Sequence, residues 1–388
     1  MKAGEEMEIY LNNAATSHPK PEAVYQAMNN FMRNQGVSYK RGKGGKYSCS
    51  ADLVEDTRGK LAQLFNIQNK SQIVFTKNAT EALNLALKGL LQASDHVIYS
   101  NLEHNSVLRP LAFLEKSLGI SKTIVQCSET GELNPEKILK AIQPNTRLIA
   151  LTHASNVLGT ILPIEKIGEI AKQHEILFLV DTAQTAGIHP IDVEKMQIDL
   201  LAFSGHKGLL GPQGTGGLYI REDLNLVPLC HGGTGGYALE WDQPLILPDR
   251  YESGTLNGVG ITGLHAGIQF ILEESIEKIR AKELQLTDYL LNNLMRLNGI
   301  TIYGTKQAEK QTGVVSFNFD DLNPIEVGYA LEEIYGIIVR TGLHCSPMAH
   351  QAIGTLDIGT VRIGLGYFNT QEDIDCLIEG LKYLLNKL

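Results

Sequence analysis

The chain lacks the features that mark membrane, secreted and nucleic-acid-binding proteins. No apolar run approaches the roughly 20 residues that a membrane-spanning helix needs. The N-terminus, MKAGEEMEIYL, has acidic residues where a signal peptide has a basic and then an apolar region. A formal net charge of -9 gives no basic face for nucleic acid. We therefore expect a cytoplasmic protein that binds neither a membrane nor nucleic acid.

Cysteine is also scarce. No C-x-x-C pair occurs among the five cysteines, which argues against a zinc ribbon and a disulfide framework. Cys345 differs from the other four because it lies in a loop with glycine and proline, beside Arg340 and His344, and these surroundings favour an accessible thiolate. His344, Cys345 and His350 could also bind a metal. Their spacing matches no recognised ligand pattern, so we expect no metal site.

The rest of the composition is that of a globular protein, with 43% hydrophobic and 20% charged residues. Short apolar runs alternate with helical stretches through the first half of the chain. Strands are predicted at 73–75, 97–99, 123–125, 148–151, 176–180 and 200–203, and helices at 80–91, 106–118, 135–142 and 164–174. This alternation predicts an α/β fold with a mainly parallel sheet and helices on both faces.

A smaller lobe is predicted toward the C-terminus, because 388 residues are enough for two lobes. A long helix at 275–297 leads to strands at 314–319, 337–340 and 360–363 and to a closing helix at 371–385. We therefore expect a large domain over residues 20–270 and a small C-terminal α+β domain over residues 271–388, with the N-terminal segment 1–19 joined to the small domain.

Lys207 lies in the most distinctive stretch of the chain, LAFSGHKGLLGPQGTGGLYI at residues 201–220. A buried strand is predicted just before it, and the glycines after it let the backbone approach a ligand closely. A lysine at the end of a buried strand is a candidate Schiff-base lysine, because desolvation lowers its pKa and frees the amine as a nucleophile. Taken alone, Lys207 could equally be an exposed loop lysine.

Polar residues follow several of the other predicted strands, where ligands bind in folds of this type. Thr80 opens a helix whose N-terminus can bind an anion. His104 could lie flat on an aromatic ring, Asn156 could donate to a ring oxygen, and Asp181 could hold a proton on a pyridine-type nitrogen. Each also has an ordinary alternative as a helix cap or a hydrogen-bonded loop residue. Together with Lys207 they match the groups that pyridoxal phosphate requires.

The ordered motifs resemble those of the class V, fold-type I pyridoxal-phosphate enzymes, and within them the cysteine desulfurase and selenocysteine lyase group. The resemblance covers nearly the whole chain and is carried by LNNAATSHPKP, TKNATEALN, LEHNSV, HASNVLG, VDTAQ, FSGHK, ESGTLN, VRTGLHC and VRIGLGYFNT. It implies a fold-type I architecture and pyridoxal 5'-phosphate as the cofactor.

The resemblance also implies a role for each cofactor-binding residue. Lys207 would form the Schiff base, Asp181 would pair with the pyridinium nitrogen, and His104 would stack on the ring. Gln184 would donate to the ring hydroxyl, and Thr80, Ser204 and His206 would hold the phosphate. Ala79 and Asn156 are also assigned to cofactor binding. Thr255 would reach the phosphate of the opposite subunit, which implies a homodimer.

On the substrate side, Cys345 matches the family residue that attacks the substrate sulfur and carries it away as a persulfide. Arg362 matches the residue that binds the substrate carboxylate, a task suited to a bidentate guanidinium. Asn13 and Arg340 are also assigned to substrate binding. The catalytic residues would then be Lys207, Cys345 and His104.

The predicted function is therefore a cysteine desulfurase that converts L-cysteine to L-alanine and passes sulfur to an acceptor protein. A selenocysteine lyase, acting on L-selenocysteine with selenium in place of sulfur, is an alternative. So is a class V aminotransferase or another lyase, because a fold does not determine a reaction. A non-catalytic sulfur carrier with a degenerate site is disfavoured by intact Lys207, Asp181 and Arg362.

Overall fold

A seven-stranded sheet forms the centre of the molecule. The structure is a computed structural model that describes residues 8–38 and 46–387. In order across the sheet the strands are β2 (Ile73–Thr76), β8 (Gly216–Ile220), β7 (Leu200–Ser204), β6 (Leu177–Asp181), β5 (Thr146–Thr152), β3 (His96–Ser100) and β4 (Ser121–Val125). Only β8 runs antiparallel to its neighbours, β2 and β7. The predicted mainly parallel sheet is confirmed.

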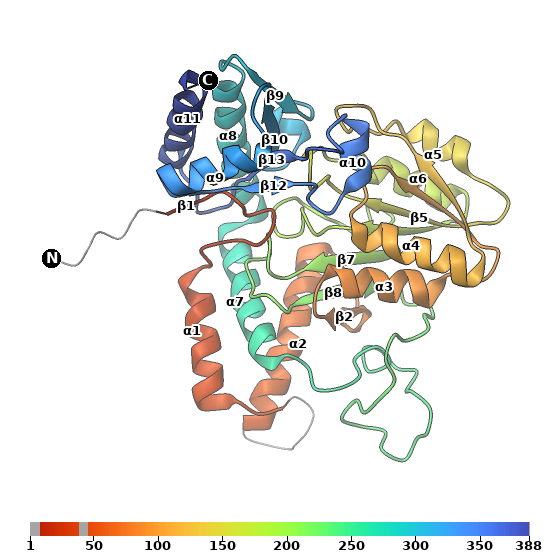
Figure 1. Cartoon of the computed structure of the whole chain (residues 1–388). Helices are drawn as coiled ribbons and strands as arrows, with labels where there is room; N and C mark the ends of the chain where they lie inside the picture. Colours follow the sequence, from red (N-terminus) through yellow and green to blue (C-terminus); the bar gives the residue numbers. More distant parts are fainter. Residues whose placement is uncertain (1–7, 39–45, 388) are drawn as a thin grey trace.

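Helices cover both faces of this sheet (Figure 1). Successive side chains of a strand point to opposite faces, so Ile73 and Phe75 pack into one hydrophobic cluster and Val74 into another. The first cluster contains side chains of α2 (Lys46–Phe65), α5 (Pro135–Ala141), α6 (Ile164–Gln173) and α7 (Gly258–Glu274). The second contains side chains of α3 (Ala79–Leu90) and α4 (Asn105–Leu118). Helix α1 (Glu22–Asn30) lies beside α7, and a π-helical turn, Phe31–Gln35, follows it.

The C-terminal part has its own sheet and its own core. Its antiparallel strands are β12 (Arg340–Gly342), β13 (Thr360–Gly364), β10 (Val314–Phe319) and β9 (Ile300–Tyr303). Helices α8 (Ile276–Leu294), α9 (Pro324–Tyr335) and α11 (Gln371–Asn386) pack in a third hydrophobic cluster. The cluster also contains Ile9 and Leu11, and β1 (Ile9–Tyr10) pairs with β11 (Ile337–Ile338). The α+β character is confirmed, and the domain boundaries stay a prediction.

Several elements differ from the sequence-based expectation. The strand predicted at 337–340 is two short strands, β11 and β12, which belong to different sheets. Helix α7 was not predicted because glycines interrupt its apolar pattern. These glycines permit close packing, since a Cβ at Gly267 would lie 2.6 Å from the carbonyl oxygen of Leu209.

The apolar pattern also did not reveal strand β9 and helix α9. The remaining elements are short. They are α10 (Pro347–Ala352) and two 3-10 turns, Lys70–Gln72 and Ala308–Lys310. Within residues 8–38 and 46–387, no helix is both long and apolar enough to cross a membrane.

Candidate active site

A cavity of about 280 Å³ opens at the carboxyl ends of β5, β6 and β7. These strands end at Thr152, Asp181 and Ser204, and all three residues line the cavity. It is lined by most of the predicted site residues, namely Ala79, Thr80, His104, Asn156, Asp181, Gln184, Ser204, His206, Lys207, Arg340 and Arg362. The structure therefore brings together side chains from both sheets in one place.

Lys207 lines this cavity and is partly buried. Burial lowers the pKa of Lys207 to about 8, the nearby Asp181 carboxylate opposes this shift, and the positive charges of Arg362 and Arg340 add to it. At pH 7 roughly a tenth of the amine is consequently uncharged, which is far more than for a lysine of ordinary pKa, and the uncharged form is the nucleophile.

Asp181, at the end of β6, is a buried carboxyl with one engaged oxygen. Its Oδ1 accepts a hydrogen bond from the Ala183 N–H at 2.9 Å. No other hydrogen bond to this side chain occurs in the described part of the chain, and the carboxyl faces the cavity. Burial raises the pKa of Asp181, while the Ala183 N–H and the Lys207 charge lower it. A cationic N–H donor placed in the cavity would stabilise this carboxylate.

One end of the cavity is suited to an anion. It contains the N-terminus of α3, where the Ala79 N–H donates to Ser204 Oγ at 3.0 Å. The Thr80 and Ser106 hydroxyl oxygens are 2.7 Å apart. His206 Nδ1 is buried and has no hydrogen-bond partner among the described residues. These donors fit a phosphate group, which accepts several hydrogen bonds at once.

His104 is the N-cap residue of α4. Its Nδ1 accepts from the Ser106 N–H at 3.1 Å and lies 2.8 Å from Ser106 Oγ. Burial, together with the positive charges of Lys207 and Arg340, lowers the pKa of His104 to about 4. The ring is therefore neutral at physiological pH and lines the cavity in a fixed orientation.

Two arginines face each other across β12 and β13. Arg340 and Arg362 are directly opposite in the register of the two strands, an arrangement that destabilises like charges. Neither forms an ion pair with a carboxylate of the described region. Arg362 donates to the Asn156 carbonyl at 2.9 Å and to Asn12 Oδ1 at 3.2 Å, while its buried Nε has no partner there.

Burial lowers the pKa of Arg362 to about 9, and the Arg340 charge contributes to this shift. A buried guanidinium that lacks a counterion and lies opposite a second cation would be stabilised by an anion. The arginine pair, which lines the cavity, is therefore suited to binding a carboxylate.

Three hydrogen bonds attach the Cys345 loop to residues that follow strands of the seven-stranded sheet. The Asn105 N–H donates to the Cys345 carbonyl at 2.8 Å, Asn156 Nδ2 donates to the His344 carbonyl at 2.7 Å, and the Ser346 hydroxyl donates to Asn156 Oδ1 at 2.6 Å. His344 and Cys345 both have positive φ angles, 48° and 61°. The thiol is exposed, and its Sγ lies 3.8 Å from Arg340 Nη2.

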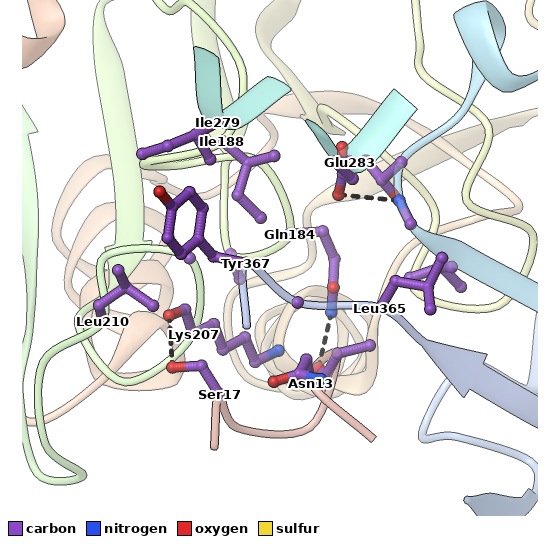
Figure 2. Close-up of a pocket in the computed structure, with 17 residues that line it drawn as sticks. Asn13, Ser17, Gln184, Ile188, Lys207, Leu210, Ile279, Glu283, Leu365 and Tyr367 are labelled. Carbon is purple, nitrogen blue, oxygen red and sulfur yellow. Dashed lines mark hydrogen bonds between the residues drawn. The ribbon is translucent and has the colours of Figure 1, made fainter. Parts of the chain in front are cut away.

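Two predicted residues lie elsewhere. Thr255 lines a separate cavity that also contains Cys230. Asn13 lines a smaller cavity of about 50 Å³, which shares Gln184 and Lys207 with the larger one (Figure 2). Its amide donates to the Gly364 carbonyl, and Gln184 donates to the Ala14 carbonyl at 3.2 Å. The predicted roles of Thr255 and Asn13 stay predictions.

Sequence reasoning missed several residues of the site. Asn12, which binds Arg362, lies in the LNNAAT motif but was not singled out. Glu103 precedes His104 and is fully buried, with Oε1 accepting from the Ser100 hydroxyl at 2.6 Å and Oε2 without a partner in the described region. Burial raises the pKa of Glu103 to about 8. Its position in the LEHN motif was the only available signal.

The histidines near Cys345 form no metal site with it. The His344 and His350 rings are 5.5 Å apart, and each forms a hydrogen bond with a threonine hydroxyl, Thr360 and Thr355 respectively. Among residues 8–38 and 46–387, no group of three or more potential metal ligands is found.

Comparison with known proteins identifies the family. The family model described as aminotransferase class V matches residues 9–377. The chain belongs to the class V aminotransferase family. A probable cysteine desulfurase from Methanothermobacter thermautotrophicus is 36% identical over 386 residues, which cover 96% of this chain and 94% of the relative. A cysteine desulfurase from Yersinia pestis is 33% identical and is covered over 92% of its length.

A solved structure supports the same assignment. The apo cysteine desulfurase from Thermococcus onnurineus has a TM-score of 0.93 and 34% sequence identity, with 98% of this chain and 95% of that chain covered. The predicted family and the fold-type I architecture are thereby confirmed. Members of the class V family generally depend on pyridoxal phosphate, which is consistent with the residues around the cavity.

Proposed function

We propose that this class V enzyme is a pyridoxal-phosphate-dependent cysteine desulfurase that releases L-alanine and carries the sulfur as a persulfide on Cys345. The observation that carries the proposal is the position of the Cys345 thiol, 3.8 Å from the arginine that lines the Lys207 cavity. The matched relatives are named cysteine desulfurases, which supports the same reaction.

The residues around the cavity fit the cofactor. Asp181 has an oxygen available for a ring nitrogen, and His206 Nδ1 and the N-terminus of α3 are available for a phosphate. His104 has a neutral ring that can stack. Pyridoxal phosphate, when bound, supplies an aldehyde that exchanges amines and a ring that withdraws electrons from the substrate α-carbon.

The chain's own residues bind and deprotonate the substrate. Arg362, opposite Arg340, holds the carboxylate of L-cysteine at the end of the cavity nearest Cys345. The Lys207 amine, whose pKa is about 8, removes the proton from the α-carbon and later returns a proton to the product. Asp181 keeps the ring nitrogen protonated, because a buried carboxylate stabilises an adjacent cation.

The Cys345 thiolate then attacks the substrate sulfur. A sulfur–sulfur bond forms, the carbon–sulfur bond breaks, and its electron pair stays on the β-carbon, which takes up a proton. The overall balance is L-cysteine plus the Cys345 thiol giving L-alanine plus the Cys345 persulfide. Arg340 Nη2, 3.8 Å from Cys345 Sγ, lies beside the attacking sulfur.

Further parts of the proposal concern partners. The exposed Cys345 suits transfer of sulfur to an acceptor protein. Thr255 lies outside the Lys207 cavity of its own chain, which agrees with a homodimer in which it reaches the site of the other subunit. The cytoplasmic location stays a prediction.

Product release from L-cysteine tests the reaction, with L-selenocysteine assayed in parallel. With a thiol reductant present to release the persulfide sulfur, we expect alanine and sulfide from the wild type. Cysteine turnover should be at least about a hundredfold lower in Cys345→Ala, because a nucleophile of the chemical step is lost. Cys230→Ala, which removes another exposed thiol, serves as the control and should keep full activity.

The other outcomes separate the alternatives. Turnover of selenocysteine alone, with Cys345→Ala active, would identify a selenium-directed lyase. If neither substrate yields alanine, the desulfurase assignment is wrong, and a panel of amino and keto acids would test for an aminotransferase.

A further inference from the structure

The N-terminal segment holds the peptide bond that carries Lys207. The carbonyl oxygen of His206 accepts from the Ser17 N–H at 3.0 Å, from the Thr16 hydroxyl at 3.1 Å and from Lys20 Nζ at 2.8 Å. The Ser17 hydroxyl also lies 2.9 Å from the Lys207 carbonyl oxygen (Figure 2). A carbonyl with three donors is fixed in orientation, so the backbone at Lys207 is fixed as well.

Lys20 is the member of this group that an ordinary surface role does not explain. Its Nζ donates to Ser17 Oγ at 2.6 Å in addition to the His206 carbonyl, and no carboxylate of the described chain pairs with it. Burial lowers the pKa of Lys20 to about 8. An ammonium without a counterion in this environment costs free energy, so a surface lysine would be the more stable arrangement.

The segment that includes Lys20 also reaches the arginine pair. Asn12 accepts from Arg362, and Asn13 Nδ2 donates to the Gly364 carbonyl of β13 at 3.0 Å. A bridge between Asn12 and Gly364 adds a backbone contact. Residues 12–20 therefore connect the strand that presents Arg362 to the peptide that presents Lys207.

We propose that Lys20 is a positioning residue for Lys207. Lys20 fixes the peptide that precedes Lys207 and so keeps the Lys207 amine aligned with the carboxylate site on β13. This inference rests on the proposed function, in which the Lys207 amine moves a proton at the substrate α-carbon. A small displacement of that amine lowers the rate of the chemical step more than the affinity for substrate.

Substitutions in the cofactor-loaded protein test this role. Lys20→Met keeps an unbranched stem and removes the charge and its donors, Lys20→Arg keeps both, and Lys166→Met on the exposed face of α6 is the matched control. We expect Lys20→Met to shift the midpoint of the pH titration of the visible absorption of the lysine-bound cofactor by about 0.5 units or more. We also expect kcat for cysteine to fall about tenfold with KM within about twofold.

Lys20→Arg should restore both values, and Lys166→Met should leave them unchanged. A wild-type titration midpoint and kcat in Lys20→Met would overturn the inference, as would Lys20→Arg behaving like Lys20→Met. The absorption readout needs no substrate, so it decides the matter even if the wild type makes no alanine and the proposed function fails.

A variant that does not fold would be replaced by Ser17→Ala, which removes the hydroxyl between Lys20 and the Lys207 carbonyl. We expect the same direction of spectral shift with a smaller size. An unchanged spectrum in folded Ser17→Ala would contradict the positioning role.

Discussion

The ion pair between Arg58 and Glu252 lies in the protein interior, and Glu252→Gln should destabilise the fold measurably. The two side chains are 0% and 3% exposed. Arg58 also donates to the Ile73 carbonyl, and Glu252 Oε1 accepts from the Phe75 N–H at 2.7 Å. Glutamine can keep that acceptor, but it removes the charge and places an NH2 group where Glu252 Oε2 accepts from Arg58. Breaking a buried pair costs about 3–5 kcal/mol. We expect about 3 kcal/mol, because Glu55 also pairs with Arg58.

This free energy converts to a measurable temperature. An unfolding entropy of about 2.1 cal/mol/K per residue gives about 0.8 kcal/mol/K for the whole chain, so Tm should fall by about 4 °C. Thermal unfolding followed by circular dichroism at one scan rate measures the change. The control is Glu165→Gln, whose pair with Lys195 is 44% and 65% exposed and should contribute less than about 1 °C.

A second substitution separates charge from packing. Arg58→Met in the Glu252→Gln background removes a buried charge that Glu55 compensates only in part, so the double variant should be more stable than Glu252→Gln alone. The reasoning is refuted if Glu252→Gln lowers Tm no more than Glu165→Gln does. Because Glu252 lies three residues before Thr255, the same variant also tests whether this pair holds the segment that the dimer prediction concerns.

Two further predictions concern the active site. Glu103 has a pKa of about 8 in the folded chain, compared with an ordinary value of 4.5. Between these two pH values the folded chain retains a proton that the unfolded chain loses. The free energy of unfolding therefore falls as the pH rises from about 4.5 to about 8. Glu103→Gln should flatten this decline, by about 5 kcal/mol at most, in unfolding measured at several pH values; parallel curves for the two proteins would be evidence against it. Arg362→Lys should raise KM for cysteine about tenfold or more with a smaller effect on kcat, because an ammonium does not bind a carboxylate bidentately. Steady-state kinetics measure this, and an unchanged KM would show that the carboxylate binds elsewhere.

The strands and the residues at their ends could be predicted from the sequence. Asp181 and Lys207 each follow an apolar run, and a parallel sheet brings such ends together. The pairing of Arg340 with Arg362 could not be predicted, because it depends on the register of two short strands in the folded chain. The role of Lys20 was hidden for a similar reason, since its acceptor is a backbone carbonyl 186 residues away.

The positive φ angles at His344 and Cys345 have an evolutionary consequence. A non-glycine residue in this conformation costs roughly 1 kcal/mol, and β-branched residues are strongly disfavoured there. Glycine adopts this conformation without strain but loses more backbone entropy on folding, so stability alone gives cysteine no advantage at position 345. A protein of this fold that no longer needs the thiol chemistry should therefore accept glycine or asparagine at this position.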